Sequence, residues 1–155
     1  MDVNHLNPAL DSIVNVLTTM AGITPTIGKP SIKTDQNAHG VITGLIDLVS
    51  KDTNGSLAIS FSKAVALELE LANKMLRLDT DVVDEEIEDL IGEMTNMVAG
   101  GAKAIYQEQG YDFDLTRPNV ITGENHQVKH SVKGTTILLP FNTESGEFYV
   151  EACFN

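Results

Sequence analysis

An acid and an amide stand one helical turn apart on the same side of a long predicted helix, in the segment EMTNMVAGGAK at 93–103. At about 100° of turn per residue, residues 82–110 divide into an apolar stripe and an opposite polar stripe. Glu93 accepts hydrogen bonds and pairs with cations, whereas the carboxamide of Asn96 both donates and accepts them. Together they offer ion pairing and directed hydrogen bonding to a molecule that approaches. The polar stripe consists of Glu86, Asp89, Glu93, Asn96, Gly100, Lys103 and Gln107, and the apolar stripe of Ile87, Ile91, Met94, Val98, Ala102 and Ile105.

Two features of the polar stripe weaken the helix locally. An amphipathic helix usually means only that one side packs on a core and the other faces water. Asn96, however, lies mid-helix, where its short amide competes with the backbone for hydrogen bonds. Gly100 and Gly101 follow within about one turn, and each costs about 1 kcal/mol of helix stability relative to alanine. Gly100 leaves the polar stripe bare for the close approach of another molecule, so these features indicate a docking surface.

The wider pattern around these residues is that of a known family. The segment from Glu93 to Lys103, with Asp89 four residues before Glu93, resembles the (D/S)xxxExxN signature of the CheC/CheX/FliY chemotaxis phosphatases. One ExxN pair is present, and the resemblance is therefore to CheX rather than to CheC, which typically has two. The resemblance spans nearly the whole chain. Its other landmarks are Gly28-Lys29-Pro30, Gly55-Ser56-Leu57 leading to Ser60-Phe61-Ser62, and Arg117-Pro118-Asn119-Val120-Ile121-Thr122-Gly123.

The resemblance implies a phosphatase that hydrolyses the aspartyl phosphate of a phosphorylated CheY-like response regulator. Asn96 would orient the attacking water, because a neutral carboxamide is not repelled by a phosphoryl group and this reaction depends on positioning. Glu93 would pair with the active-site lysine of the regulator and fix the register of docking. Asp89, Gly100 and Lys103 would belong to the surrounding docking surface, although Asp89 is equally well interpreted as an ordinary surface acid.

Metal-binding and nucleophilic chemistry have weak support in the sequence. No cluster of ligands in this chain has convincing metal-site spacing, and the resemblance implies that the partner regulator supplies Mg²⁺. We therefore expect no cofactor bound by this chain. His126 and His130 could share a strand face as part of a metal site, but without a third ligand the favoured interpretation is solvent-facing strand histidines. Cys153 has no adjacent base that would predict a nucleophile.

Composition excludes several other classes of function. A formal net charge of -12 over 155 residues makes nucleic acids and anionic membranes poor partners and suits a basic or cation-bearing one. The single cysteine excludes an internal disulfide, and no apolar run is long enough to span a membrane. The N-terminal segment MDVNHLNPAL lacks the basic and apolar regions of a signal peptide. We expect a cytoplasmic protein in which residues 1–155 form one CheX-like domain.

Three helices are expected from the hydrophobic periodicity. The first has Asn7 as its cap, Pro8 as its first residue and Gly22 as its stop. The second runs over 63–76 after a Ser62 cap, and the third is the long helix, which Gly110 ends.

Strands are expected between and after these helices. Ser31 to Thr34 is predicted to be an edge strand because Pro30 directly precedes it and prolines are confined to sheet edges. A hairpin turn is predicted at 51–55, with Asn54 and Gly55 supplying its positive-φ positions. The order predicts an α+β fold, an antiparallel-dominated β-sheet with a long helix and two shorter helices packed on it, as in CheC-like proteins. The remaining strand predictions are 41–49, 57–61, 118–121, 135–141 and 148–154, and residues 127–132 also alternate as a strand does.

Alternatives from other functional classes stay open on the sequence alone. One is a non-catalytic response-regulator-binding or flagellar-switch-like interaction module, in which the ExxN pair can be absent. Another is an oligomeric scaffold whose acidic stripe binds a basic partner without chemistry. The presence of both Glu93 and Asn96 favours the phosphatase. The resemblance also implies a homodimer whose sheet edges meet across a two-fold axis, and apolar strands near the C-terminus suit that pairing.

Overall fold

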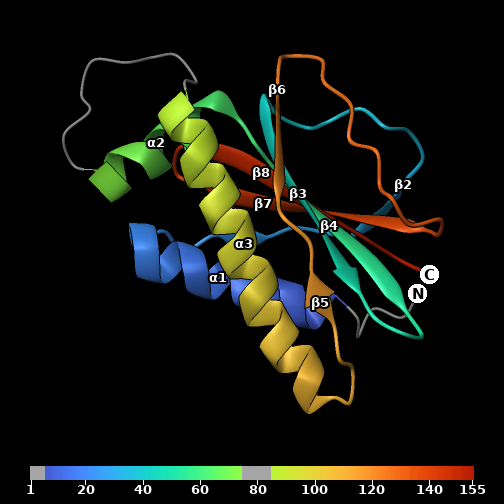
Figure 1. The fold of residues 1–155 in the computed structure, drawn as a ribbon. Coiled ribbons are helices and arrows are strands. Elements are labelled where there is room, and N and C mark those ends of the chain that lie inside the picture. Colours follow the sequence, from blue (N-terminus) through green and yellow to red (C-terminus); the bar gives the residue numbers. More distant parts are fainter. Residues whose placement is uncertain (1–5, 75–84) are drawn as a thin grey trace.

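The computed structural model of the chain describes residues 6–74 and 85–155. One layer consists of three helices and the other of an eight-stranded sheet, so the predicted α+β class is confirmed. Figure 1 shows α1 and α3 crossing one another over the same face of the sheet. The helices are α1 (Asn7–Ala21), α2 (Lys63–Lys74) and α3 (Glu85–Glu108). The predicted helix residues 75–76 and 82–84 lie outside the described part of the chain.

Every strand pair described in the sheet is antiparallel. The strands follow the order β1-β7-β8-β4-β3-β5, with β2 also beside β7 and β6 also beside β3. The strand nearest the C-terminus, β8, therefore lies in the centre of the sheet, with a partner on each side. The strands are β1 (Thr26–Ile27), β2 (Ser31–Lys33), β3 (Ile42–Val49), β4 (Asn54–Phe61), β5 (Asp114–Leu115), β6 (Asn119–Thr122), β7 (Thr136–Thr143) and β8 (Gly146–Phe154).

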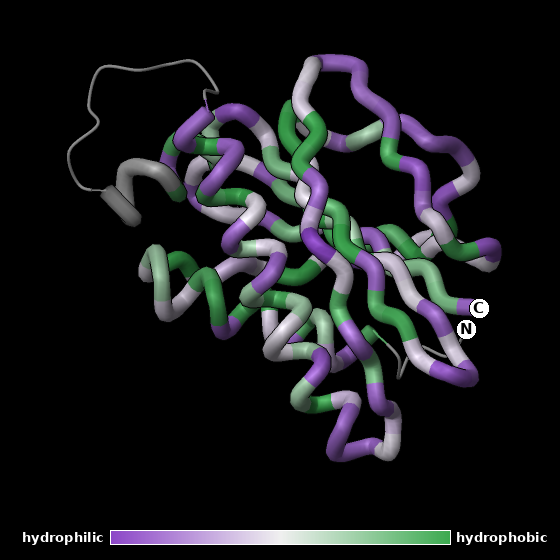
Figure 2. Tube along the Cα trace, viewed as in Figure 1, coloured by the Kyte–Doolittle hydropathy of each residue, from purple (hydrophilic) through white to green (hydrophobic). Residues whose placement is uncertain are grey.

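The core lies between the helices and the sheet. Figure 2 shows hydrophobic and hydrophilic residues alternating in short runs along α3, as expected for a helix with one buried side. The residues of its predicted apolar stripe are buried except Ile105, which is half-buried. Full burial of an isoleucine, methionine or valine side chain contributes about 1.5–3 kcal/mol, so α3 is held firmly with its polar stripe outward. The opposing strand residues include Ile42, Ile59, Phe61, Phe148 and Val150.

The start of α1 differs from the prediction. The helix begins at Asn7, and the preceding residue is Leu6, which is in a helical conformation and makes no side-chain cap. Leu6 is 2% exposed and packs in a core cluster with Tyr106 and Phe113. Apolar packing therefore fixes this helix start, and Asn7 is not the cap. The stop at Gly22 is confirmed, because Gly22 adopts the left-handed conformation with φ 65°.

The turn between β3 and β4 lies earlier in the chain than predicted. Val49 pairs with Asn54, so Asn54 and Gly55 belong to β4 and the turn consists of the intervening residues. The side chain of Asn54 accepts a hydrogen bond from the backbone N–H of Ser50 at 3.1 Å. Gly55 is required for space, because a Cβ there would lie 2.3 Å from the ring of Phe154. Its role is close packing in the sheet rather than a positive φ.

Residues 127–132 do not form a strand. Gln127 makes one isolated bridge with Asn37, and the N–H of Val128 donates to the carbonyl oxygen of Gln36 at 2.7 Å. Val128 is 2% exposed. Its burial explains the apolar position in this segment without continuous pairing to a strand. The two-residue strands β1 and β5 were not predicted, because segments so short carry no periodic signal.

Candidate active site

The two central residues of the polar stripe lie on the outer surface of α3. Glu93 and Asn96 are both exposed, and Asp89 is exposed one turn before Glu93. Thr95 and Met94, between them in sequence, point the other way and are 1% exposed. The helix therefore presents the acid and the amide to a second molecule instead of packing them into the interior.

A large apolar side chain accompanies this pair. Met97 is 44% exposed and directly follows Asn96. Sequence reasoning did not single it out, because methionine at one helical position gives no signal of exposure. A flexible, polarizable thioether adapts to irregular partner surfaces. The outer side of α3 therefore combines charge, amide and apolar surface within two turns.

The two glycines of α3 have different surroundings. A Cβ built at Gly100 meets nothing within 4 Å, so the bare stretch predicted on the polar stripe faces open space. A Cβ at Gly101 would lie 2.3 Å from Oγ of Ser12, so Gly101 is needed where α1 crosses α3. Lys103, one turn beyond Gly100, is half-buried. Gly100 thus extends the open surface, whereas Gly101 has a packing role that the sequence did not reveal.

His126 and His130 lie elsewhere, on the sheet face away from the helices. Nε2 of His126 is 2.5 Å from Oγ1 of Thr43, and its Nδ1 is 2.7 Å from the carbonyl oxygen of Gly123. Nδ1 of His130 is 2.7 Å from Oγ of Ser56. The side chain of His130 is 8% exposed, so the expectation of solvent-facing strand histidines is wrong for it. Loop residues fold over this face and bring both rings down onto strand hydroxyls.

His130 belongs to a buried charge network that sequence reasoning missed. Glu151 on β8 is fully buried, with its carboxylate 2.8 Å from Nζ of Lys33 and 3.0 Å from Nε2 of His130. Burial raises the pKa of the Glu151 carboxyl, but hydrogen bonds from His130 and Lys33 outweigh it, and the pKa lies below its ordinary value. Only the folded chain shows this, because strand alternation does not reveal that a loop covers the second face.

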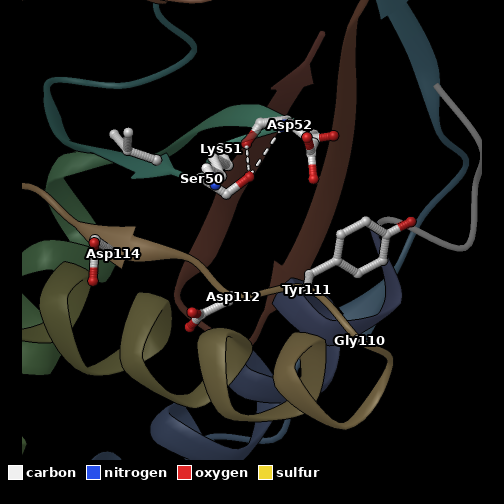
Figure 3. A pocket seen from close by; sticks show the side chains of 9 residues that line it. Ser50, Lys51, Asp52, Gly110, Tyr111, Asp112 and Asp114 are labelled. Atoms are coloured by element: carbon white, nitrogen blue, oxygen red, sulfur yellow. Dashed lines mark hydrogen bonds between the residues drawn. The ribbon is translucent and has the colours of Figure 1, made fainter.

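A hollow lies on the surface away from Asn96. It has a volume of about 560 Å³ and lies between the β3–β4 turn and the segment after α3. Figure 3 shows Asp52, Tyr111 and Asp112 around it. Asn96 is about 20 Å away along the helix axis, since each helical residue rises about 1.5 Å. Within the described ranges, no group of three or more His, Cys, Asp or Glu side chains is arranged to hold a metal ion.

Comparison with known proteins finds similar sequences and similar folds. The family model described as chemotaxis phosphatase CheX matches residues 42–142. The CheY-P phosphatase CheX of Thermotoga maritima is 30% identical over 148 residues, which cover 95% of this chain and 92% of that protein. A crystal structure of a CheC-like superfamily protein from Shewanella sp. PV-4 is 42% identical with a TM-score of 0.91, covering 100% of this chain and 99% of that one.

A further solved structure contains a partner protein. The crystal structure of the CheX-CheY-BeF3-Mg²⁺ complex from Borrelia burgdorferi matches with 26% identity and a TM-score of 0.77, covering 99% of each chain. Among the described helices of the present chain, none is both long enough and apolar enough to cross a membrane.

Proposed function

The chain belongs to the chemotaxis phosphatase CheX family, and from this premise we propose that it hydrolyses the aspartyl phosphate of a CheY-like response regulator through the outer side of α3. The single observation that supports the location is the exposure of Glu93 and Asn96, one turn apart, at the centre of that helix. The relative from Borrelia burgdorferi, solved as a complex with CheY, supports the class of partner.

Asn96 has the proposed role of orienting the attacking water. The water oxygen attacks phosphorus while the bond between phosphorus and the aspartyl oxygen of the regulator breaks. The products are inorganic phosphate, which takes the water oxygen and its protons, and a free aspartate carboxylate. Because the transition state for this transfer is loose, alignment of the water contributes more than its deprotonation. A carboxamide can accept a hydrogen bond from the water and donate to a phosphoryl oxygen without adding negative charge.

Glu93 has the proposed role of a docking residue. Its carboxylate lies one turn from Asn96 on the same side of α3, so it can pair with a lysine beside the phosphoryl group while Asn96 faces that group. Mg²⁺, which we expect the regulator to hold, neutralises charge on the phosphoryl oxygens when it is bound. Asp89, Gly100 and Lys103 are proposed contacts at the periphery, where Asp89 is exposed and Gly100 is open.

A homodimer is the second part of the proposal. The apolar strands β7 and β8 lie inside the sheet, so they do not supply a free edge. The exposed hydrophobic residues Ile27 and Ile32 instead lie in β1 and β2, both beside β7. Short edge strands with exposed isoleucines can pair with the same edge of a second copy. We therefore place the proposed two-fold contact at this edge.

The test of the catalytic assignment is phosphate release from phosphorylated CheY-like regulators. Asn96→Ala is expected to lower the stimulated rate by about 100-fold or more, the scale of loss when an oriented reactant loses its positioning group. Asn15→Ala on α1 is a matched control, because Asn15 is also an exposed helical asparagine. Dephosphorylation by Asn96→Ala at the wild-type rate, with an unchanged circular dichroism spectrum, would refute the proposed role.

A further inference from the structure

The turn of α3 that carries Glu93 and Asn96 lies close to the sheet. Thr95 lies directly above Gly44 of β3, and a Cβ built on Gly44 would be 1.8 Å from Oγ1 and 2.9 Å from Cβ of Thr95. Any side chain at position 44 therefore collides with this helix. Oγ1 of Thr95 also donates a hydrogen bond of 2.7 Å to the carbonyl oxygen of Ile91. The hydroxyl is held against its own helix and occupies the space that Gly44 leaves.

A second contact lies beside the first. Gly44 pairs with Val120 of β6 across the antiparallel register. A Cβ at Gly92, on the same turn of α3, would be 3.4 Å from Cγ2 of Val120. Residues 92–95 therefore rest on one cross-strand pair, with Gly92 over Val120 and Thr95 over Gly44. Gly44 on the sheet is the small residue that lets the backbones approach at this turn, whereas a Cβ at Gly92 would make an ordinary contact with Val120.

We propose that Gly44 and Thr95 are positioning residues, whose contact sets the depth of this turn of α3 on the sheet and thereby the place where the Asn96 carboxamide meets the reacting phosphoryl group. The proposal rests on the role assigned to Asn96 above. Asn96 projects outward, so the backbone beneath it determines where its amide lies. Displacement of a reactive group by about 1 Å can cost up to 100-fold in rate. A helix lifted from the sheet here would misplace the short amide of Asn96, whereas the longer, flexible side chain of Glu93 can still reach its partner.

Gly44→Ala tests this directly, because the added methyl has no space beneath Thr95. We expect kcat for release of phosphate from a phosphorylated regulator to fall about tenfold, with KM changed by less than about twofold. Such a split separates misalignment of bound reactants from weaker docking. Combining it with Thr95→Ala removes Oγ1 and Cγ2 and leaves the Cβ of residue 95, at 2.9 Å, as the nearest atom, so the double variant is expected to recover part of the lost kcat. Two substitutions that destabilise the protein independently would not restore kcat. Recovery would therefore show that residues 44 and 95 are energetically coupled.

Gly55→Ala is the matched control in the neighbouring strand. Its Cβ would lie 2.3 Å from the ring of Phe154, so it creates a comparable collision. Gly55 is four residues along β4 from Ile59, the partner of Gly44, which is about 13 Å along the strand. We expect Gly55→Ala to lower the midpoint of thermal unfolding as Gly44→Ala does while leaving kcat unchanged.

The outcomes separate this inference from the proposed function. Wild-type kcat in Gly44→Ala, while Asn96→Ala is inactive, overturns the inference and leaves the proposed function intact. Equal losses of kcat in Gly44→Ala and Gly55→Ala overturn it as well. Wild-type activity in Asn96→Ala removes the premise itself. If Gly44→Ala yields no folded protein, Thr95→Ala and Thr95→Ser decide: we expect kcat to fall about threefold in the first and to be kept in the second. Equal kcat in these two variants overturns the inference.

Discussion

Oγ of Ser12 on α1 donates a hydrogen bond of 2.7 Å to the carbonyl oxygen of Val98 on α3, and it does so against the bare backbone of Gly101. Ser12 is 5% exposed, so the hydroxyl and the carbonyl satisfy each other away from water. This contact lies less than one turn after Asn96. It ties the two crossing helices together beside the proposed active surface.

Ser12→Ala is expected to lower the free energy of unfolding by about 1–2 kcal/mol, because loss of a buried hydrogen bond leaves the carbonyl of Val98 with one partner fewer. Gly101→Ala should cost more, since its Cβ collides with Oγ of Ser12. Urea unfolding followed by circular dichroism measures both. Gly100→Ala is the control: its Cβ meets open space, and we expect it to be neutral or stabilising. Equal effects at Gly100 and Gly101 would contradict the helix-crossing role.

Glu93→Gln is expected to weaken binding of the phosphorylated regulator, mainly through a raised KM, by about tenfold. Because charged pairs on a surface are screened by salt, the wild-type complex should weaken between low and high ionic strength more than the variant complex does. Isothermal titration at two salt concentrations checks this. Glu108→Gln, an exposed acid near the end of α3, is the control. Identical salt dependence in wild type and Glu93→Gln would argue against ion pairing at this residue.

Glu151→Gln is expected to destabilise the fold by about 3 kcal/mol near neutral pH, because it leaves the buried Lys33 charge without its carboxylate partner. The lowered pKa of Glu151 means that its contribution is present above the ordinary carboxyl value of 4.5. That contribution is lost as pH falls from there through the folded-state pKa. The difference in unfolding free energy between wild type and variant should therefore shrink below about pH 4.5. A constant difference down to pH 3 would exclude the proposed charge pairing, and Glu124→Gln, at an exposed acid, is the control.

Ile32→Lys is expected to convert a dimer into a monomer, because the charged side chain would be buried at the proposed contact between sheet edges. Ile32 is 68% exposed in the single chain, so the substitution should leave the fold unchanged. Light scattering coupled to size-exclusion chromatography measures the mass. Val49→Lys, at an exposed residue of β3 away from this edge, should keep the dimer. A wild-type monomer at all concentrations would remove the dimer proposal.

The sequence predicted the long helix and its orientation because a 3.6-residue period persists over the whole of α3. Once the apolar residues identify the buried side, the exposed side is the opposite one. Predictions from local sequence failed where residues far away in the chain determine the structure. Asn54-Gly55 has the composition of a turn, but the ring of Phe154 needs the space over Gly55, so the turn precedes it. Gly44 appears in the sequence only as an interruption of a strand. Glycine is needed there because Thr95 of α3 packs against it, and this contact forms only when α3 folds onto β3.

The central place of β8 has a consequence for how the protein is made. On one side β8 pairs with β4 and on the other with β7, so it is the strand that joins the two halves of the sheet. During translation, β3 and β4 can form their hairpin early. In the described sheet, β4 and β7 are joined only by β8, so the sheet stays incomplete until residue 154 has emerged from the ribosome. We therefore expect nascent chains shorter than this to expose the apolar face of β4 and to depend on chaperones.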